Sequence, residues 1–284
     1  MDGHVRAGEA RAEAGDAKAG RRGGSHAEGV SEELRPRAEG PDVYVHAAWE
    51  REFPGLACGI TAAGPGADFG LTTSPDAWTL AGGMVGLGDG LGVPGVAMIR
   101  QVHGRRVLTV GAVPPGALLL AGDADGLVTD QRGVLLAVTA ADCVPVYLLD
   151  PETGALGVLH AGWRGAAAGV LEAGVGALER ELGVPAGRLR VHLGPAICGD
   201  CYEVGPEVLR AFGRHAEGPA RLDLRRELAA RAEEAGVEPN AIGVSTHCTR
   251  CGADRFHSHR GSGGTAGRMA AFLGWRGTGC PEGG

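Results

Sequence analysis

Two histidines and one cysteine offer the kinds of side chain that bind soft divalent metals. Catalytic zinc usually has three protein ligands and an open fourth position, so His103, Cys143 and His160 predict one open, catalytic zinc site. Asp142 could accept a hydrogen bond from one imidazole and so orient it. The wide sequence separation of the ligands leaves another interpretation open, in which the histidines are ordinary polar residues and the cysteine is a buried thiol.

The same residues allow other chemistry. A His₂Cys site also suits a single copper ion, as a laccase-like, copper-dependent phenol oxidase would require. A three-copper cluster needs several histidine-rich blocks, and His257-Ser-His259 is the single His-x-His in the chain, which disfavours a true laccase. Without metal, Cys143 could be a nucleophile and His160 its base. A non-enzymatic binding module is disfavoured by the concentration of His, Cys and Arg in short glycine-flanked blocks.

Arginines and aromatic residues near these blocks are candidates for substrate binding. A guanidinium group matches phosphate oxygens two at a time, so Arg164, Arg260 and Arg268 could hold phosphate, or they could form surface ion pairs. Tyr202 is a further candidate for substrate contact. Trp163 could stack on a purine base or anchor the core at a tight turn.

Four of the seven cysteines form two C-x-x-C pairs, Cys198 with Cys201 and Cys248 with Cys251. Two such pairs have the spacing of a Cys₄ zinc site. The segment between the pairs is long and contains two expected helices, which favours separate core or loop thiols over a second metal.

Strands are expected on the N-terminal side of each candidate ligand. Apolar runs of strand length occupy residues 96–102 before His103, 134–139 and 144–149 around Cys143, and 154–159 before His160. Strand ends followed by turns are common positions for the chemistry of α/β enzymes. The pattern therefore places the candidate site at strand ends.

The remaining elements follow from apolar spacing and from caps. Residues 166–182 carry the strongest helical periodicity, and Gly183 with Pro185 ends it. Further helices are expected at 206–212 and at 223–235, with Asp223 as the N-cap of the second. Other expected strands are 43–45, 59–61, 188–193 and 241–245, and 268–275 is an apolar element of unassigned type.

Composition divides the chain into one folded domain and two tails. Residues 1–42 contain almost no large apolar side chain, so they cannot bury enough surface to offset their ordering entropy. We expect a disordered N-terminal extension over 1–42, a single catalytic domain over 43–276 and a flexible tail over 277–284.

The bulk properties exclude several partners and settings. A net charge of −7 with no basic face disfavours nucleic acid. The chain has no run of 18 apolar residues and no apolar N-terminal segment, so neither a membrane span nor a signal peptide is expected. Seven cysteines, an odd number, favour a cytoplasmic protein with reduced thiols.

Five ordered sequence blocks together resemble the YfiH-type family, whose members are called polyphenol oxidases, laccase-domain proteins or purine nucleoside phosphorylases. The blocks are 101–104 (QVHG), 139–145 (TAADCVP), 160–165 (HAGWRG), 194–198 (GPAIC) with 201–205 (CYEVG), and 248–251 (CTRC) with 256–260 (FHSHR) and 265–268 (TAGR). The resemblance covers about residues 96–275.

The resemblance implies both a site and a reaction. Zinc would be held by His103, Cys143 and His160, and the substrates would be purine nucleosides and phosphate. The implied reactions are phosphorolysis of adenosine, inosine and methylthioadenosine, with adenosine deamination as a further activity. The implied fold is α+β, a single domain with a layered α/β/β/α arrangement of mixed sheets flanked by helices.

The chain departs from the family pattern at two places. Residues 61–90 lack the Asn-Leu-Gly run and the acidic stretch that the family has there, which puts part of the substrate pocket in doubt. His257 and His259 stand where aromatic residues are more usual.

Overall fold

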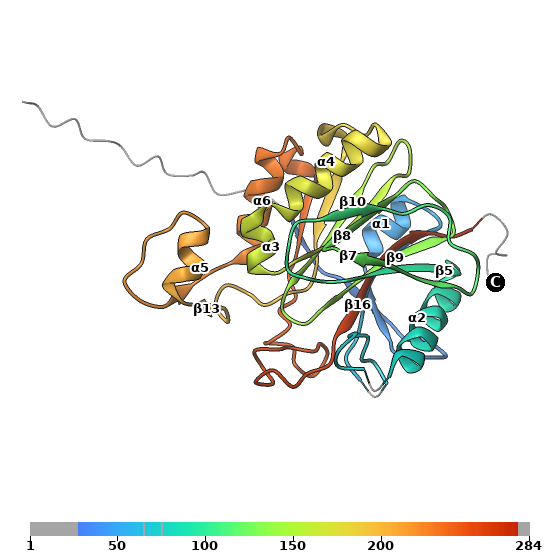
Figure 1. Ribbon diagram of the computed structural model, residues 1–284, viewed down its shortest axis with the longest axis horizontal. Coiled ribbons are helices and arrows are strands. Elements are labelled where there is room, and N and C mark those ends of the chain that lie inside the picture. Colours follow the sequence, from blue (N-terminus) through green and yellow to red (C-terminus); the bar gives the residue numbers. More distant parts are fainter. Residues whose placement is uncertain (1–27, 65, 75, 278–284) are drawn as a thin grey trace, which may run out of the picture.

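The computed structural model describes residues 28–64, 66–74 and 76–277, and in this part of the chain two seven-stranded sheets pack face to face (Figure 1). The first sheet has the order β1 (Glu28–Val30), β15 (Ile242–Ser245), β12 (Arg190–Leu193), β10 (Val144–Leu149), β11 (Leu156–Ala161), β8 (Gly126–Thr129) and β6 (Val107–Thr109). The second has the order β2 (Glu33–Arg35), β3 (Val43–Val45), β4 (Leu56–Thr61), β16 (Met269–Trp275), β9 (Val134–Ala140), β5 (Gly95–Arg100) and β7 (Leu118–Asp123). Both sheets mix parallel and antiparallel pairs.

Helices cover the outer face of each sheet. In chain order the α-helices of the described residues are α1 (Ala47–Glu52), α2 (Ala77–Leu91), α3 (Trp163–Ala168), α4 (Val170–Leu182), α5 (Pro206–Ala211) and α6 (Leu224–Glu234). Of these, α5 packs in a separate apolar cluster that projects from the sandwich (Figure 1). Apolar side chains of α4 and α6 pack on the first sheet, and those of α2 pack on the second. A third cluster fills the space between the sheets. The layers are therefore helix, sheet, sheet and helix, as predicted.

Burial on both faces explains why the central strands could be found from the sequence. Every residue of β10, β11 and β16 is buried, and strands covered on both sides read as continuous apolar runs. The element at 268–275, whose type the sequence left open, is β16. It lies between β4 and β9 in the second sheet.

The strongest predicted helix, 166–182, differs from the structure at its start. The helical segment begins at Trp163, and Gly169 interrupts it with a φ of 91°. Glycine adopts this left-handed conformation without the steric cost of a side chain, so α3 and α4 are separate helices that meet at Gly169. The predicted ends at Gly183 and at the Asp223 N-cap are confirmed, since Asp223 accepts hydrogen bonds from two backbone N–H groups of α6.

The prediction of disorder over residues 1–42 is wrong for residues 28–35. These residues form β1, which pairs with β15, and β2, which pairs with β3. Their stabilisation comes from hydrogen bonds to partner strands and from one buried carboxylate, neither of which local apolar content reveals. Residues 1–27 and 278–284 lie outside the described residues.

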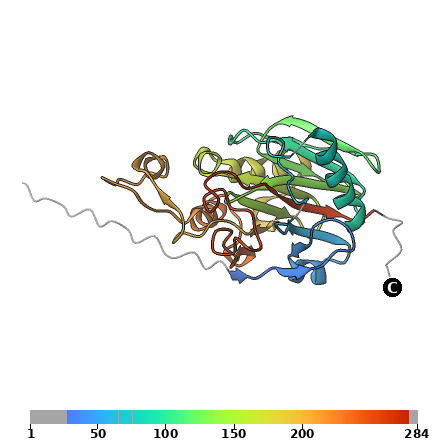
Figure 2. The same ribbon diagram turned by 90° about the horizontal axis from the view of Figure 1, so that it is seen from below.

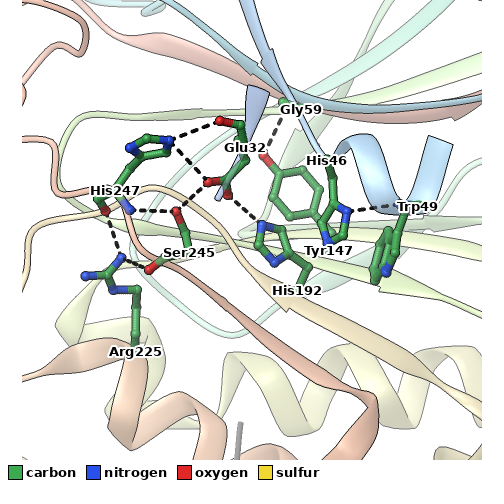
Figure 3. A network of polar contacts seen from close by, with 9 residues as sticks. All are labelled: Glu32, His46, Trp49, Gly59, Tyr147, His192, Arg225, Ser245 and His247. Atoms are coloured by element: carbon green, nitrogen blue, oxygen red, sulfur yellow. Dashed lines mark hydrogen bonds and ion pairs between the residues drawn. The ribbon is translucent and has the colours of Figure 1, made fainter. Parts of the chain in front are cut away.

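Glu32 joins these two strands and is buried between the sheets (Figure 3). Its carboxylate lies 2.7 Å from His192 Nε2 and accepts a hydrogen bond of 2.7 Å from the Ser245 hydroxyl. Nearby, the Tyr147 hydroxyl donates to the carbonyl oxygen of Gly59 at 2.9 Å and so links the two sheets. Polar contacts therefore complement the apolar layer at this end of the sandwich.

Within the described residues, no helix has both the length and the apolar character that crossing a membrane would require.

Glu32 gives the stability of the chain a testable pH dependence. Burial alone would raise the pKa of this carboxyl group, but the hydrogen bond and charge of His192 and the hydroxyl of Ser245 hold the pKa below its ordinary value of 4.5. A depressed folded-state pKa stabilises the fold above pH 4.5, and this stabilisation is lost as pH falls through the folded value. We expect Glu32→Gln to lower the free energy of unfolding by about 3 kcal/mol at pH 7.

Urea unfolding at several pH values measures this effect. The difference between the native chain and Glu32→Gln should shrink as pH falls below 4.5. Glu33→Gln is the matched control, because the neighbouring Glu33 side chain is exposed, and it should change little at any pH. A difference for Glu32→Gln that stays constant with pH would contradict the assigned role of the carboxylate.

Candidate metal centre

The structure brings the three predicted ligands together. His103 follows β5 of the second sheet, Cys143 lies in the turn between β9 and β10, and His160 is the second-last residue of β11 in the first sheet. One ligand atom from each lies within 4.8 Å of the others, and the two imidazole rings meet edge to face with centroids 4.8 Å apart. We call these three residues the triad. It lies where strand ends of the two sheets meet.

Asp125 positions two members of the triad. The carboxylate is fully buried at the start of β8, and its Oδ1 lies 2.9 Å from His160 Nδ1. It also accepts hydrogen bonds from the backbone N–H groups of His103 at 2.9 Å and Gly104 at 2.6 Å. The Nδ1–H of His160 donates to Asp125, which leaves Nε2 as the nitrogen available to a metal ion.

Asp142 has a different role from the one predicted for it. Its carboxylate accepts hydrogen bonds from the hydroxyls of Thr249 and Ser258 and from the backbone N–H of Arg260, at 2.6–2.7 Å. It therefore orients no imidazole and instead fastens the 249–260 loop beside Cys143. The sequence does not single out Asp125, because Asp123 and Asp125 alternate with small residues and nothing in the spacing separates one from the other.

Backbone strain is concentrated at this site. Among the described residues, His103 and Asp142 are the two non-glycine residues with positive φ, at 58° and 82°. Such conformations cost free energy and persist where surrounding contacts hold them. The carboxylates of Asp125 and Asp142 supply those contacts.

Gly162 makes room for the ligands. A Cβ atom at this position would lie 2.9 Å from His103 Cδ2 and 3.1 Å from Cys143 Sγ, closer than side chains normally pack. Gly162, the first of the two glycines in the 160–165 block, is therefore required by the side chains of the triad.

Charges in the triad favour a thiolate. Burial alone would raise the pKa of the Cys143 thiol, but the charge of His160 and hydrogen bonds from both histidines lower the pKa to about 6. Burial alone would lower the pKa of His160, but the Cys143 thiolate and Asp125 raise the pKa to about 9. At neutral pH and without metal, these two shifts favour a thiolate on Cys143 and an imidazolium on His160. The thiolate is also the form of cysteine that binds metal.

The donor set fits a soft divalent ion. One thiolate and two imidazoles match the usual ligands of zinc, and three protein ligands leave one position open. The same set also matches copper.

A cavity of about 250 Å³ opens beside the triad. Its lining residues are His103, Ala141, Asp142, Cys143, Gly162, Trp163, Arg164, Ile197, Tyr202, Leu224, His259 and Arg260. His259 and Leu224 were not among the predicted site residues. His259 stands out in the sequence only as part of the single His-x-His, and Leu224 reads as an ordinary helix residue.

Two guanidinium groups lie over aromatic rings in the cavity wall. Arg164 Cζ is 4.3 Å from the ring centroid of Trp163, and Arg260 Cζ is 5.1 Å from that of Tyr202. Burial, with the negative charges of Cys143 and Asp142, raises the pKa of Tyr202 to about 12. Its hydroxyl therefore stays protonated and can donate a hydrogen bond.

Arg268 is not brought to the cavity with the other predicted substrate-binding residues. Its guanidinium group donates to the carbonyl oxygens of Ala266 and Gly267, and its backbone N–H donates to Asp68 at 2.9 Å. These contacts hold the loop before β16.

The family model described as "Multi-copper polyphenol oxidoreductase laccase" matches residues 84–276. The chain belongs to this family. This match confirms the resemblance to the YfiH-type, laccase-domain family that the sequence blocks indicate.

Relatives and a solved structure extend the match. The chain is 36% identical over 197 residues to adenosine deaminase RL5 from an unknown prokaryotic organism, covering 63% of this chain and 74% of that protein. It is 40% identical over 187 residues to purine nucleoside phosphorylase SCO2081 of Streptomyces coelicolor, again with 63% and 74% covered. The crystal structure of YlmD from Geobacillus stearothermophilus superposes with a TM-score of 0.76 at 31% identity, covering 87% of this chain and all of that one.

The position of Asp125 predicts that this carboxylate controls metal affinity. Asp125→Asn would weaken the acceptor for His160 Nδ1–H and for the 102–104 backbone. Since changes to residues that orient metal ligands typically cost 10–100-fold in affinity, we expect zinc to bind about 10–100-fold more weakly. Competitive zinc titration of refolded, metal-free protein measures the change.

Asp123→Asn is the control for this prediction, because Asp123 lies two residues away and pairs with Arg100 at the surface. It should leave zinc affinity unchanged. Equal affinities for the two variants would show that Asp125 does not position the triad.

Proposed function

We propose that this chain is a zinc-dependent purine nucleoside phosphorylase that also deaminates adenosine. Adenosine, inosine and methylthioadenosine are the proposed nucleosides. The observation that carries the proposal is one cavity lined both by triad residues and by two guanidinium–aromatic pairs. The names of its relatives, a deaminase and a phosphorylase, support the same two reactions.

Each wall of the cavity suits one part of the substrates. Arg164 and Arg260 would hold phosphate, because their planar forks match its oxygens. The rings of Trp163 and Tyr202, each covered on one face by a guanidinium group, would add aromatic surface against which a purine base can lie. The protonated Tyr202 hydroxyl can donate to a nitrogen or oxygen of the nucleoside.

The triad would hold zinc through His103, Cys143 and His160. A bound zinc ion would supply a Lewis acid at this end of the cavity. Asp125 keeps the Nδ1–H of His160 engaged, so that Nε2 stays directed at the site. Cys143 contributes a thiolate, and Gly162 leaves the ligands free of a neighbouring side chain.

The two proposed reactions use the same bound nucleoside. In phosphorolysis, a phosphate oxygen bonds to the anomeric carbon of the ribose while the bond from that carbon to the base breaks. The base takes the electron pair and a proton, and the products are free base and ribose 1-phosphate. In deamination, water adds at C6 of adenine and ammonia leaves, giving inosine.

Activity of purified protein tests the proposal. Zinc-loaded protein should release adenine and ribose 1-phosphate from adenosine with phosphate, and inosine from adenosine without phosphate. We expect His103→Ala to lower both rates by about 100-fold or more, because removing a ligand loosens the metal. His215→Ala is the control, since His215 lies outside the cavity lining. Native zinc-loaded protein that yields neither free base nor inosine would refute the function.

The arginines predict a separation between the two reactions. Losing a charge-assisted hydrogen bond costs about 1.5–3 kcal/mol, so Arg164→Gln should raise the KM for phosphate roughly 10–100-fold. It should change deamination much less, because that reaction uses no phosphate. Arg268→Gln is the matched control and should keep the native KM for phosphate. An equal effect of Arg164→Gln on both reactions would argue against phosphate binding at this residue.

Two other functions lead to different results in the same preparation. A copper oxidase would hold copper and oxidise phenols. Among the described residues, the triad is the one candidate metal group that contains histidines, so copper would have to bind there, to two histidines and one cysteine. A metal-free Cys-His hydrolase is favoured by the thiolate–imidazolium pair. It would keep its activity in the presence of chelators and lose it when iodoacetamide labels Cys143.

A further inference from the structure

Four cysteines form a second cluster, apart from the triad. Cys198 and Cys201 lie in the loop after β12, and Cys248 and Cys251 lie in the loop after β15. Their sulfur atoms all lie within 4.8 Å of one another, and those of Cys201 and Cys251 are 3.4 Å apart. We call these residues the thiol cluster.

The order of the strands explains how distant cysteines meet. β12 and β15 are adjacent and parallel, so the loops that follow them begin side by side at the carboxyl ends of these strands. Beyond these strand ends, Ala196 pairs with Cys248, and the Thr249 N–H donates to the Ala196 carbonyl at 3.1 Å. From the sequence alone, the length of the segment between the two pairs favours separate thiols. In the structure this segment carries β13 (Glu203–Val204) and α5, which project from the sandwich (Figure 2).

Backbone N–H groups converge on one sulfur atom of the cluster. The N–H groups of Cys198 and Cys251 donate to Cys248 Sγ at 3.3 and 3.4 Å. Hydrogen bonds to a sulfur atom favour its thiolate form, the form that binds metal. The neighbouring cation, Arg250, directs its guanidinium group to the carbonyl oxygen of Cys201 instead.

The spacing of the sulfur atoms fits one tetrahedral ion. Zinc–sulfur bonds of about 2.3 Å place the sulfur atoms of a tetrahedral site about 3.8 Å apart. The separations in the thiol cluster, from 3.4 Å for one pair to a limit of 4.8 Å, include this value. Each C-x-x-C pair has the spacing of half of a Cys₄ zinc site.

We propose that Cys198, Cys201, Cys248 and Cys251 bind a second zinc ion in a closed, structural site. Four thiolate ligands leave no open position, in contrast to the three ligands of the triad, so this ion takes no part in chemistry. A tetrahedral set of four sulfur ligands is selective for zinc or iron over harder cations.

The second zinc would tie together two walls of the cavity. Ile197 and Tyr202 flank the first cysteine pair, and His259 and Arg260 follow the second, and all four residues line the cavity. Protein contacts already join these loops at the Ala196–Cys248 bridge and through hydrogen bonds from Arg250 to the Cys201 carbonyl and from Arg260 to the Glu203 carbonyl. A metal at the thiol cluster would fix the loops to each other at a further point, and so hold Arg260 over the ring of Tyr202.

Metal analysis of protein purified under reducing conditions without added metal tests the proposal. We expect about two zinc ions per chain in the native protein. Cys201→Ser with Cys251→Ser should leave about one, and so should His103→Ala with Cys143→Ser. Cys58→Ala is the control, because Cys58 is a buried thiol of β4 outside the cluster, and it should keep both ions. The first pair of substitutions should also lower Tm by roughly 5–10 °C.

A second measurement uses the native chain alone, in case the double variant does not fold. Cobalt exchanged into the protein should give the intense charge-transfer absorption of a tetrathiolate site, and metal removal should expose about five additional reactive thiols, four from the thiol cluster and Cys143 from the triad. One zinc per chain without the cobalt band, iron in place of the second zinc, or a disulfide between the pairs in freshly purified protein would overturn the proposal. The result is independent of activity on purines, because His103→Ala with Cys143→Ser should still hold the second ion.

Discussion

A single buried carboxylate, Asp125, determines the geometry of the candidate site. A buried charge is tolerated only where hydrogen bonds compensate for lost water, and here the donors are the His160 ring and the backbone N–H groups of the 102–104 turn. Those same bonds hold His103 at its strained φ of 58°. Hydrogen bonds to one buried carboxylate therefore align two candidate metal ligands, His103 and His160, and the position of the third follows from the turn between β9 and β10.

The site depends on the completed sandwich. His103 follows a strand of the second sheet, His160 belongs to the first, and Cys143 lies where the chain passes from β9 to β10. Neither sheet alone holds all three residues. The packing of the apolar layer between the sheets therefore determines how far apart the triad residues lie. The hydrogen bond from Tyr147 to Gly59 across that layer fixes the same alignment. The site is therefore complete only when the two sheets are packed together.

The sequence predicted those features that local pattern encodes. Strands buried on both faces are continuous apolar runs, so the triad could be placed at strand ends and the layered α+β fold could be expected. Asp125 was missed because its role arises from partners up to 35 residues away. α2 was missed because its many glycines obscure helical periodicity. The position of Arg268 outside the cavity and the meeting of the four cysteines could not be predicted for the same reason. Only the order of the strands in the sheets decides which loops lie side by side.

The segment from Glu28 to Arg35 has one more consequence. Its two short strands form the outermost positions of both sheets, β1 beside β15 and β2 beside β3. Open strand edges are templates for pairing with another molecule, and proteins commonly protect them with very short outer strands. One peptide of eight residues, anchored in its middle by the buried Glu32, therefore protects an edge of each sheet at once. Detachment of that peptide would leave β15 and β3 as unpaired outer strands at the same time. We therefore expect these eight residues to limit aggregation as well as to complete the fold.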